Sequence, residues 1–284
     1  MADAASVTFL NIGQGDATLI HLLEAASGIV VDCGSGGSGK MLDLLEKEDI
    51  QEIPLVILSH SDRDHVGGIM EVLDNFPGVV REIAVNHDRL PADYSERQYR
   101  HFLRRLAQYV RSHPECRRTG LLCPLSWTFG SLNLTLLHPE GVDATDAVSR
   151  NLRNESSAVV LLEVESDRVL LTADIEGIGW EWLLSRHPDL RARVFKLPHH
   201  GGWHASGVTL DKVLQLVEPE VMIISVGLNN QYGHPSPRTM TALVEYLDLQ
   251  GSAEVFVTQL AATSHARIQG VGDITIRLPL QGVA

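Results

Sequence analysis

The sequence predicts an α/β fold in a single domain that covers residues 1–284. The 284 residues are 44% hydrophobic, which supports a packed core and argues against disorder. Short apolar runs of the kind found in strands recur along the chain, with helical segments between them. Neither a linker nor a repeat divides the chain, so we expect one α/β domain with its functional side chains in loops at the strand ends.

The first third of the chain is predicted to consist mainly of strands, because its short apolar runs are separated by glycine and polar residues. The expected strands are Val7–Ile12, Ala17–Leu22, Gly28–Asp32, Leu55–Ser59 and Glu82–Asn86. Gly39–Glu48 is predicted to be a helix. The segment Gly34–Met41 matches the GxxxxGK pattern of a phosphate-binding loop, but Met41 stands where such loops have Ser or Thr, so we interpret it as a glycine turn.

The rest of the chain continues this pattern of strands and intervening helices. The expected strands are Leu121–Leu125, Leu132–Leu137, Ala158–Val164, Arg168–Thr172, Val194–Leu197, Val221–Val226, Glu254–Thr258 and Asp273–Leu278. The segments Gly177–Ser185 and Pro237–Leu249 are predicted to be helices.

Cysteine usage and the N-terminal residues indicate a soluble, cytoplasmic protein. The three cysteines, Cys33, Cys116 and Cys123, lack metal-binding spacing, and a sparse, odd number fits a reducing compartment. The N-terminus has neither the basic nor the apolar region of a signal peptide. Because no apolar run approaches the ~20 residues of a membrane span, we expect no membrane contact.

Arginine is concentrated in a predicted helical insertion at about residues 87–120. This segment has eight arginines and four acidic residues, whereas the whole chain has a net charge of −13. Four of the arginines recur at helical spacing, opposite an apolar side that includes Phe102 and Leu106: Arg97, Arg100, Arg104 and Arg111. They form either a solvated helix surface or an arm that binds phosphates of a nucleic acid, which the acidic remainder of the chain would repel.

Four potential metal ligands lie in the stretch SHSDRDHVGG, directly after the apolar run Ile53–Leu58. They are His60, Asp62, Asp64 and His65. Alternate residues of an extended segment share one face, and the following glycines permit a tight turn into a helix. Four ligands at such short spacing exceed what one tetrahedral ion takes from one loop, so they predict two ions, each completed by distant residues. A solvated acidic loop would explain the aspartates but not the flanking histidines.

The distant ligands are expected at the ends of other strands. Asp174 ends the apolar run LLTAD, His199 and His200 follow a strand in LPHHGG, and His234 lies beyond another strand in YGHP. A single histidine in a loop is more often a hydrogen-bonding residue than a ligand. Repeated coincidence of a strand end with a potential ligand nevertheless favours a metal site.

These motifs, in this order, resemble those of the metallo-β-lactamase superfamily, and more narrowly the nuclease-like domain of the competence protein ComEC and its soluble relatives. The N-terminal FLNIGQGDATLI and VVDCGSG also match that family's opening strands. The resemblance extends from about Val7 to about Leu278. It implies a four-layer αββα sandwich with the site at one edge of the two sheets.

The resemblance also implies roles for individual residues. His60 and Asp62 would hold a first ion, Asp64 and His65 a second, and Asp174 would bridge the two. The remaining residues are implied to lie around the ions: His234 completing the second site, His199 and His200 as extra ligand or proton donor, and Asn154 and Ser157 near the substrate. Which of the three histidines touch metal stays open.

Two departures from the superfamily pattern bear on the metal. Asp62 replaces the middle histidine of His-x-His-x-Asp-His, as in the ComEC group, and an oxygen ligand makes Mn²⁺ as plausible as Zn²⁺. Ala173 stands where glycine usually precedes the bridging aspartate. The membrane channel of the competence protein is absent from this sequence, so DNA uptake is not implied.

The leading hypothesis is a metal-dependent phosphodiester hydrolase, a DNA or RNA nuclease in which two ions activate a water molecule. One alternative is a small-molecule hydrolase acting on a cyclic nucleotide, lactone or thioester, and the other is a non-catalytic partner protein that keeps the fold. Because a freely active nuclease would damage its own cell, we expect control by the insertion, by a regulatory protein partner or by an activating protease.

Overall fold

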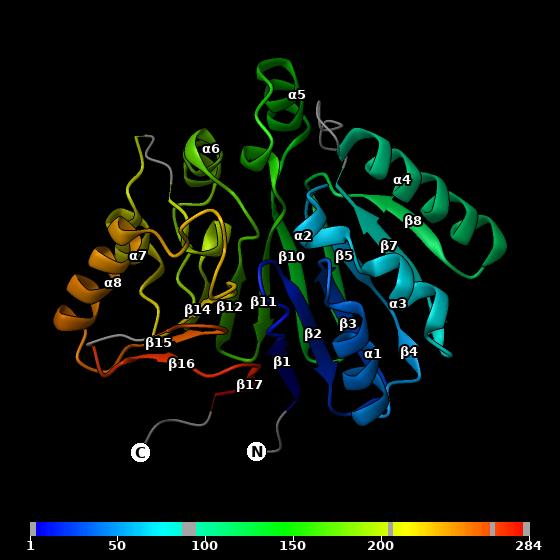
Figure 1. The fold of residues 1–284 in the computed structure, drawn as a ribbon, viewed down its shortest axis with the longest axis horizontal. Helices are drawn as coiled ribbons and strands as arrows, with labels where there is room; N and C mark the ends of the chain where they lie inside the picture. Colours follow the sequence, from blue (N-terminus) through cyan, green and yellow to red (C-terminus); the bar gives the residue numbers. More distant parts are fainter. Residues whose placement is uncertain (1–3, 87–94, 204–206, 262–264, 281–284) are drawn as a thin grey trace.

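The computed structural model describes residues 4–86, 95–203, 207–261 and 265–280, with the backbone alone for residues 95–98. Two β-sheets pack face to face, and helices cover both outer faces, so the chain forms four layers in the order αββα (Figure 1). This arrangement confirms the predicted fold class. Within the described residues, no helix combines the length and apolar character needed to cross a membrane.

The first sheet mixes antiparallel and parallel strands. Its strands, in spatial order, are β17 (Ile274–Leu278), β1 (Ala5–Phe9), β2 (Ala17–Leu22), β3 (Ser27–Cys33), β5 (Val56–Leu58), β7 (Glu82–Val85) and β8 (Arg117–Gly120). The short strand β4 (Glu52–Ile53) pairs with β3, and β6 (Val79–Val80) pairs with β4. The strands β3, β5, β7 and β8 are parallel to one another. Their carboxyl ends therefore lie at the same edge of the sheet.

The second sheet also contains parallel strands whose carboxyl ends lie at one edge. Its strands, in spatial order, are β16 (Ile268–Gly270), β15 (Glu254–Val257), β14 (Val221–Ile224), β13 (Val194–Lys196), β12 (Asp167–Leu171), β11 (Val159–Val164), β10 (Leu132–His138) and β9 (Leu125–Phe129). The strands from β12 to β16 run parallel. Loops that follow β12, β13 and β14 consequently emerge side by side.

Helices close the sandwich on both sides (Figure 1). The first sheet is covered by α1 (Ser38–Lys47), α2 (Arg63–Val66), α3 (Ile69–Asn75) and α4 (Ser95–Ser112), and the second by α6 (Gly177–Arg186), α7 (Leu210–Val217) and α8 (Pro237–Leu249). The helix α5 (Gly141–Arg150) lies at the top of Figure 1. Local sequence determines the start of α8: the Ser236 hydroxyl accepts a hydrogen bond from the amide of Thr239, and Pro237 occupies the first helical position.

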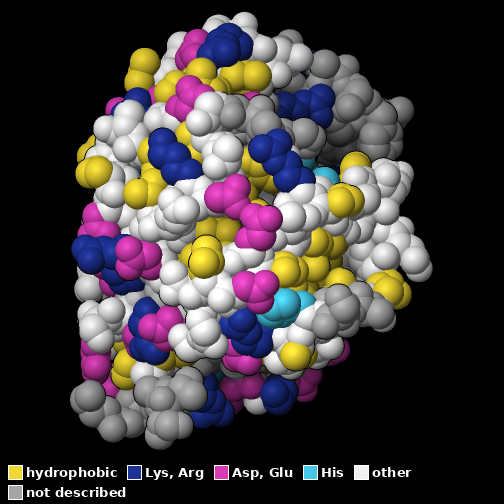
Figure 2. All heavy atoms as spheres, turned by 90° about the vertical axis from the view of Figure 1, so that its left-hand side faces the viewer, with side chains coloured by type: hydrophobic (Ala, Val, Ile, Leu, Met, Phe, Trp, Pro, Cys, Tyr) yellow, Lys and Arg dark blue, Asp and Glu magenta, His cyan; other side chains and the backbone are white. Residues whose placement is uncertain are grey.

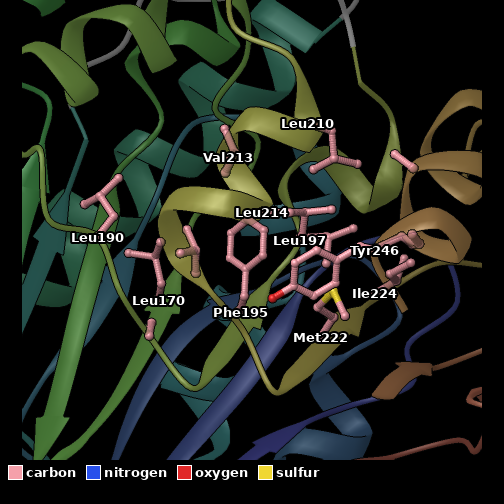
Figure 3. Packing of buried hydrophobic residues seen from close by; sticks show 14 of the residues in the cluster. Leu170, Leu190, Phe195, Leu197, Leu210, Val213, Leu214, Met222, Ile224 and Tyr246 are labelled. Atoms are coloured by element: carbon pink, nitrogen blue, oxygen red, sulfur yellow. The ribbon is translucent and has the colours of Figure 1, made fainter. Parts of the chain in front are cut away.

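Buried hydrophobic side chains fill the spaces between all four layers. One cluster joins the two sheets, a second packs α1, α3 and α4 against the first sheet, and a third packs α6, α7 and α8 against the second. Figure 3 shows part of the third cluster, where Phe195 of β13 contacts side chains from the helices, including Leu214 and Tyr246. These cores hold the carboxyl ends of both sheets in fixed positions.

Most predicted strands are confirmed to within two residues at each end, but two predictions differ more from the structure. The first strand ends at Phe9 rather than Ile12, because the amide of Asn11 donates to the Asp273 carboxylate instead of a strand partner. The strand predicted at Leu121–Leu125 is wrong: residues 121–124 connect the two sheets and include Pro124, which has no N–H to donate, and the strand begins at Leu125. The sequence patterns also missed β8, β16, α5 and α7.

The arginine-rich segment lies at the edge of the first sheet. Its residues 87–94 lie outside the described part of the chain, and the rest forms α4 and β8. Phe102 and Leu106 of α4 are buried against the core, whereas Arg100, Arg104 and Arg111 are exposed. Arg97 lies in the first turn of α4, for which only the backbone is described. The predicted stripe of exposed arginines therefore consists of the three whose side chains are described.

Candidate metal centre

The predicted ligands gather where the two sheets meet at their carboxyl ends. The segment from His60 to His65 follows β5 and leads into α2. Asp174 follows β12, and the pair His199 and His200 follows β13. The loop of residues 225–236 follows β14 at the same edge. The topology thus brings together side chains that are more than a hundred positions apart in the sequence.

Four histidines at this edge share one arrangement, in which the ring nitrogen Nδ1 is held by a neighbouring oxygen. The partners are Ser59 Oγ at 3.1 Å for His60, Asp32 Oδ2 at 2.8 Å for His65, the Glu176 carboxylate for His199, and the Ser225 carbonyl at 2.9 Å for His200. Outer partners of this kind orient metal-binding histidines in proteins. The arrangement leaves Nε2 of each ring for the interior of the site.

The four Nε2 atoms surround the carboxylate of Asp174. They lie 3.8 Å (His60), 3.1 Å (His65), 3.9 Å (His199) and 3.6 Å (His200) from its oxygens. The Nε2 of His60 is buried and has no hydrogen-bond partner among the described residues. A buried nitrogen without a partner is costly, so an electrophile is needed there, and a divalent cation fits the donor set.

Two further carboxylates flank this group. Asp62 Oδ2 lies 4.0 Å from His60 Nε2, and Asp64 Oδ2 lies 3.3 Å from His200 Nε2. Both aspartates are partly exposed, unlike Asp174. Asp62 thus lies near His60, and Asp64 lies near His200, around the carboxylate of Asp174.

The backbone around the histidine pair is held in an uncommon conformation. Ala173, His199 and His200 have φ values of 44°, 49° and 53°, in the left-handed region that non-glycine residues rarely adopt. The amide of His199 donates to the Ala173 carbonyl at 3.0 Å, which ties the two ligand loops together. Strain of this kind persists where surrounding structure imposes it, often at functional sites.

The glycine turn supports the metal-binding loop. A Cβ atom at Gly34 would lie 1.9 Å from the carbonyl oxygen of Asp64, and one at Gly15 would lie 2.4 Å from it. The same carbonyl accepts a hydrogen bond from the amide of Asp16 at 3.0 Å. Only glycine permits this close approach, so Gly34 has a packing role that differs from the phosphate-binding one.

Opposite charges stabilise one another in this buried group. Burial alone would raise the pKa of Asp174, but the nearby His65 and His200 hold it well below its ordinary value. Burial would likewise lower the pKa of His65, but the carboxylates of Asp174 and Asp32 raise it well above its ordinary value. Protons on the histidines and a divalent cation are therefore alternative sources of positive charge in this site.

Sequence reasoning missed four residues of this region: Asp16, Asp32, Glu176 and Lys196. Asp16 offers a ligand atom within 4.8 Å of those of His65, Asp174 and His200, although its other oxygen accepts from the Lys196 ammonium at 2.9 Å. The signals were present, because each charged residue stands beside an apolar run at a strand end or in the GQGD turn. Their partners could be known only from the fold.

The other predicted site residues contact the surroundings of this group. His234 packs edge-on against the ring of His199, with ring centroids 5.0 Å apart. Asn154 donates to the Glu176 carboxylate at 3.3 Å, and Ser157 is fully buried. The exposed arginines belong to α4, whose N-terminal end is the end nearer to this edge in Figure 1.

Comparisons with known proteins agree with this geometry. Residues 10–223 match the family model described as the metallo-beta-lactamase superfamily. The chain is 25% identical over 261 residues to ComE operon protein 3 of Bacillus subtilis (86% of this chain, 31% of the relative). It is 30% identical over 245 residues to Recombination protein 2 of Haemophilus influenzae (84% of this chain, 26% of the relative). It thus spans less than a third of either relative.

The fold also recurs among solved structures. The metallo-beta-lactamase fold protein YhfI from Bacillus subtilis superposes with a TM-score of 0.56 at 14% identity, covering 96% of this chain and 99% of that one. At this identity the likeness concerns the fold alone.

Proposed function

Because this chain belongs to the metallo-beta-lactamase superfamily, we propose that it is a metal-dependent phosphodiester hydrolase that cleaves nucleic acid. The observation that carries the proposal is the convergence of four histidine Nε2 atoms on the Asp174 carboxylate, with Asp62 and Asp64 next to two of these histidines. This set suits two divalent ions, and its mixture of imidazole and carboxylate ligands suits Zn²⁺ or Mn²⁺.

Two observations favour nucleic acid over a small molecule as the substrate. The first observation is the names of two relatives, Recombination protein 2 and ComE operon protein 3. The second observation is the exposed stripe of Arg100, Arg104 and Arg111 on α4, which suits contact with a phosphate backbone.

The opposite face of the molecule is unsuited to a phosphate backbone. The face built by α7 and α8 mixes acidic and basic side chains (Figure 2). A hollow of about 520 Å³ between these helices is lined by four acidic residues: Asp211, Glu218, Glu220 and Glu245. Substrate is therefore expected to reach the site from the side of α4.

In this proposal different side chains have different roles in hydrolysis. When bound, a pair of divalent ions supplies an activated water and neutralises charge on the scissile phosphate. Asp174, His65 and His200 would hold the ions, since their ligand atoms lie close together and all three residues are almost fully buried. Asn154, near the rim, is the candidate donor to a phosphate oxygen. We do not extend that role to Ser157, because its side chain has no exposed surface.

His199 is the best candidate for the proton donor to the leaving oxygen. Its side chain is 19% exposed, whereas that of His200 is 1% exposed. Burial acts to lower the pKa of His199, but the carboxylates of Glu176 and Asp174 raise it to about 9. In the metal-free site the ring therefore carries a proton at neutral pH, and Glu176 fixes its orientation through Nδ1.

A Glu176→Gln variant is expected to cleave roughly 10–100-fold more slowly, as for loss of an outer partner of a functional histidine. Without the carboxylate, the pKa of His199 falls, so the alkaline limb of the pH–rate profile should move to lower pH. Metal content should stay that of the unaltered protein. Glu181→Gln, which changes an acid bonded to the Gly207 amide, is the matched control. An unmoved alkaline limb would contradict the donor role.

Cleavage of supercoiled plasmid with added Mn²⁺ tests the proposed function directly. The unaltered chain should nick or degrade the DNA, and Asp64→Ala purified in parallel should not, because it loses a carboxylate beside His200. A double variant, Arg100→Ala with Arg104→Ala, should cleave DNA more slowly. Equal activity of this variant would favour a small-molecule substrate, and equal activity of Asp64→Ala would contradict catalysis at this metal centre.

A further inference from the structure

An exposed aromatic side chain lies in a loop that begins at the same sheet edge as the candidate metal centre. The loop of residues 225–236 leaves the second sheet at the edge where Asp174 and His200 lie. Within it, Tyr232 is 59% exposed. The large hydrophobic residues that are exposed in the described part of the chain are otherwise aliphatic: Val142, Val148, Leu228, Leu249 and Val271. Tyr232 is thus unusual in both type and position.

A series of rings connects Tyr232 to the centre. The rings of Tyr232 and His234 are stacked, with centroids 5.9 Å apart and planes at 19°. His234 packs edge-on against His199, with centroids 5.0 Å apart and planes at 67°. The Nε2 of His199 lies 3.9 Å from the Asp174 carboxylate. One face of the Tyr232 ring therefore packs on His234, which in turn packs against His199. The rest of the Tyr232 ring is exposed to solvent.

The loop is braced so that the tyrosine is presented in a fixed position. The Asn230 amide nitrogen donates to the carbonyls of Gly227 at 2.9 Å and His234 at 2.6 Å. Its oxygen accepts from the amides of Tyr232 at 3.1 Å and His234 at 3.0 Å. Gly202 allows the imidazole of His234 to lie directly against the loop of His199, because a Cβ there would be 2.3 Å from that ring.

We propose that Tyr232, supported by His234, is a stacking platform for a base of single-stranded nucleic acid whose neighbouring phosphodiester enters the metal centre. This inference rests on the proposed function and specifies its substrate. An unpaired base offers a free π-face, and a neutral aromatic ring binds any base in this way, so the platform selects for single strands without selecting a sequence. Rigid presentation reduces the ordering required on binding.

The test compares a short single-stranded oligonucleotide with the same sugar-phosphate backbone made entirely of abasic units. For Tyr232→Ala we expect KM for the base-bearing strand to rise roughly 5- to 150-fold, the range that one stacked base supplies. The loss should be confined to that strand, and Tyr232→Trp should retain the lower KM. Leu228→Ala, which removes an exposed apolar side chain of the same loop, is the matched control and should behave as the unaltered chain.

Either of two kinetic results would overturn the platform: an unchanged KM for Tyr232→Ala, or an equal loss on the abasic strand, which indicates a structural role. If the unaltered chain cleaves neither strand, the proposed function fails, and binding then decides the inference separately. Fluorescence anisotropy of the labelled strands in chelator would show weaker binding of the base-bearing strand to Tyr232→Ala if the platform exists. Equal affinities would overturn it.

Discussion

Replacement of Asp174 by asparagine is expected to remove the bound divalent metal and, with it, hydrolysis of DNA. All four histidine Nε2 atoms lie within 4 Å of this carboxylate. An amide has no charge, and its oxygen is a weaker metal ligand. The four histidines would therefore lose the carboxylate that they share. The loss of activity should exceed the ~10–100-fold that removal of an outer partner costs.

The measurement combines the metal content of the purified variant with its rate of plasmid nicking. Asp64→Ala removes a carboxylate that lies beside His200, whereas Asp174 lies near four histidines, so Asp64→Ala should retain more metal than Asp174→Asn. Asp189→Asn, which changes an exposed aspartate paired with Arg191, serves as the control and should match the unaltered chain in both readouts. An Asp174→Asn protein that is folded by circular dichroism and keeps its full metal content would refute a bridging role.

The second large effect concerns alkaline pH, where the metal-free protein should lose stability. A histidine whose pKa is raised by folding stabilises the folded state below its unfolded pKa of about 6.5, and this stabilisation disappears as the pH rises through the folded value. His65 and His200 have raised pKa values because neighbouring carboxylates outweigh their burial, and the pKa of His199 is about 9. For His199 alone the contribution is on the order of 3 kcal/mol.

Lowering the pH from neutrality by the same number of units should have little effect on the stability of the metal-free protein. The pKa of Asp174 is well below its ordinary value of 3.8, so its contribution is lost only as the pH falls far below that value. Thermal unfolding between pH 7 and pH 10 therefore provides the test. The Tm of the metal-free protein should fall, that of the Mn²⁺-loaded protein should change less, and His199→Gln should lose less Tm in metal-free form. If the difference in Tm between the metal-free and the Mn²⁺-loaded protein stays constant over this pH range, the histidines do not carry the stabilising charge.

The sequence predicted the inner part of the site better than its surroundings. His60, Asp64 and His65 could be chosen because polar ligands directly after a buried strand are a strong local pattern. The strand-end rule also selected His234, whose ring packs against that of His199. The rule fixes the edge of the sheet at which a residue emerges, and it does not fix how far from that edge the side chain lies.

The supporting residues could not be predicted because their partners depend on distance in space. Asp16 and Lys196 are 180 positions apart, yet they form a buried ion pair. Glu176 contacts both His199 and Asn154, and no spacing in the sequence relates the three. The missed helices α5 and α7 have simpler causes: α5 is largely polar, and α7 has only eight residues.

The pairing of β17 with β1 has a consequence for biosynthesis. The segment Ile274–Leu278 is the outer antiparallel neighbour of Ala5–Phe9, although more than 260 positions separate them. As the chain emerges from the ribosome, β1 must wait until more than 260 further residues have been synthesised before its open hydrogen-bonding edge is covered. An uncovered edge invites pairing with other chains, so we expect the nascent protein to depend on rapid synthesis or on chaperones until β17 is available.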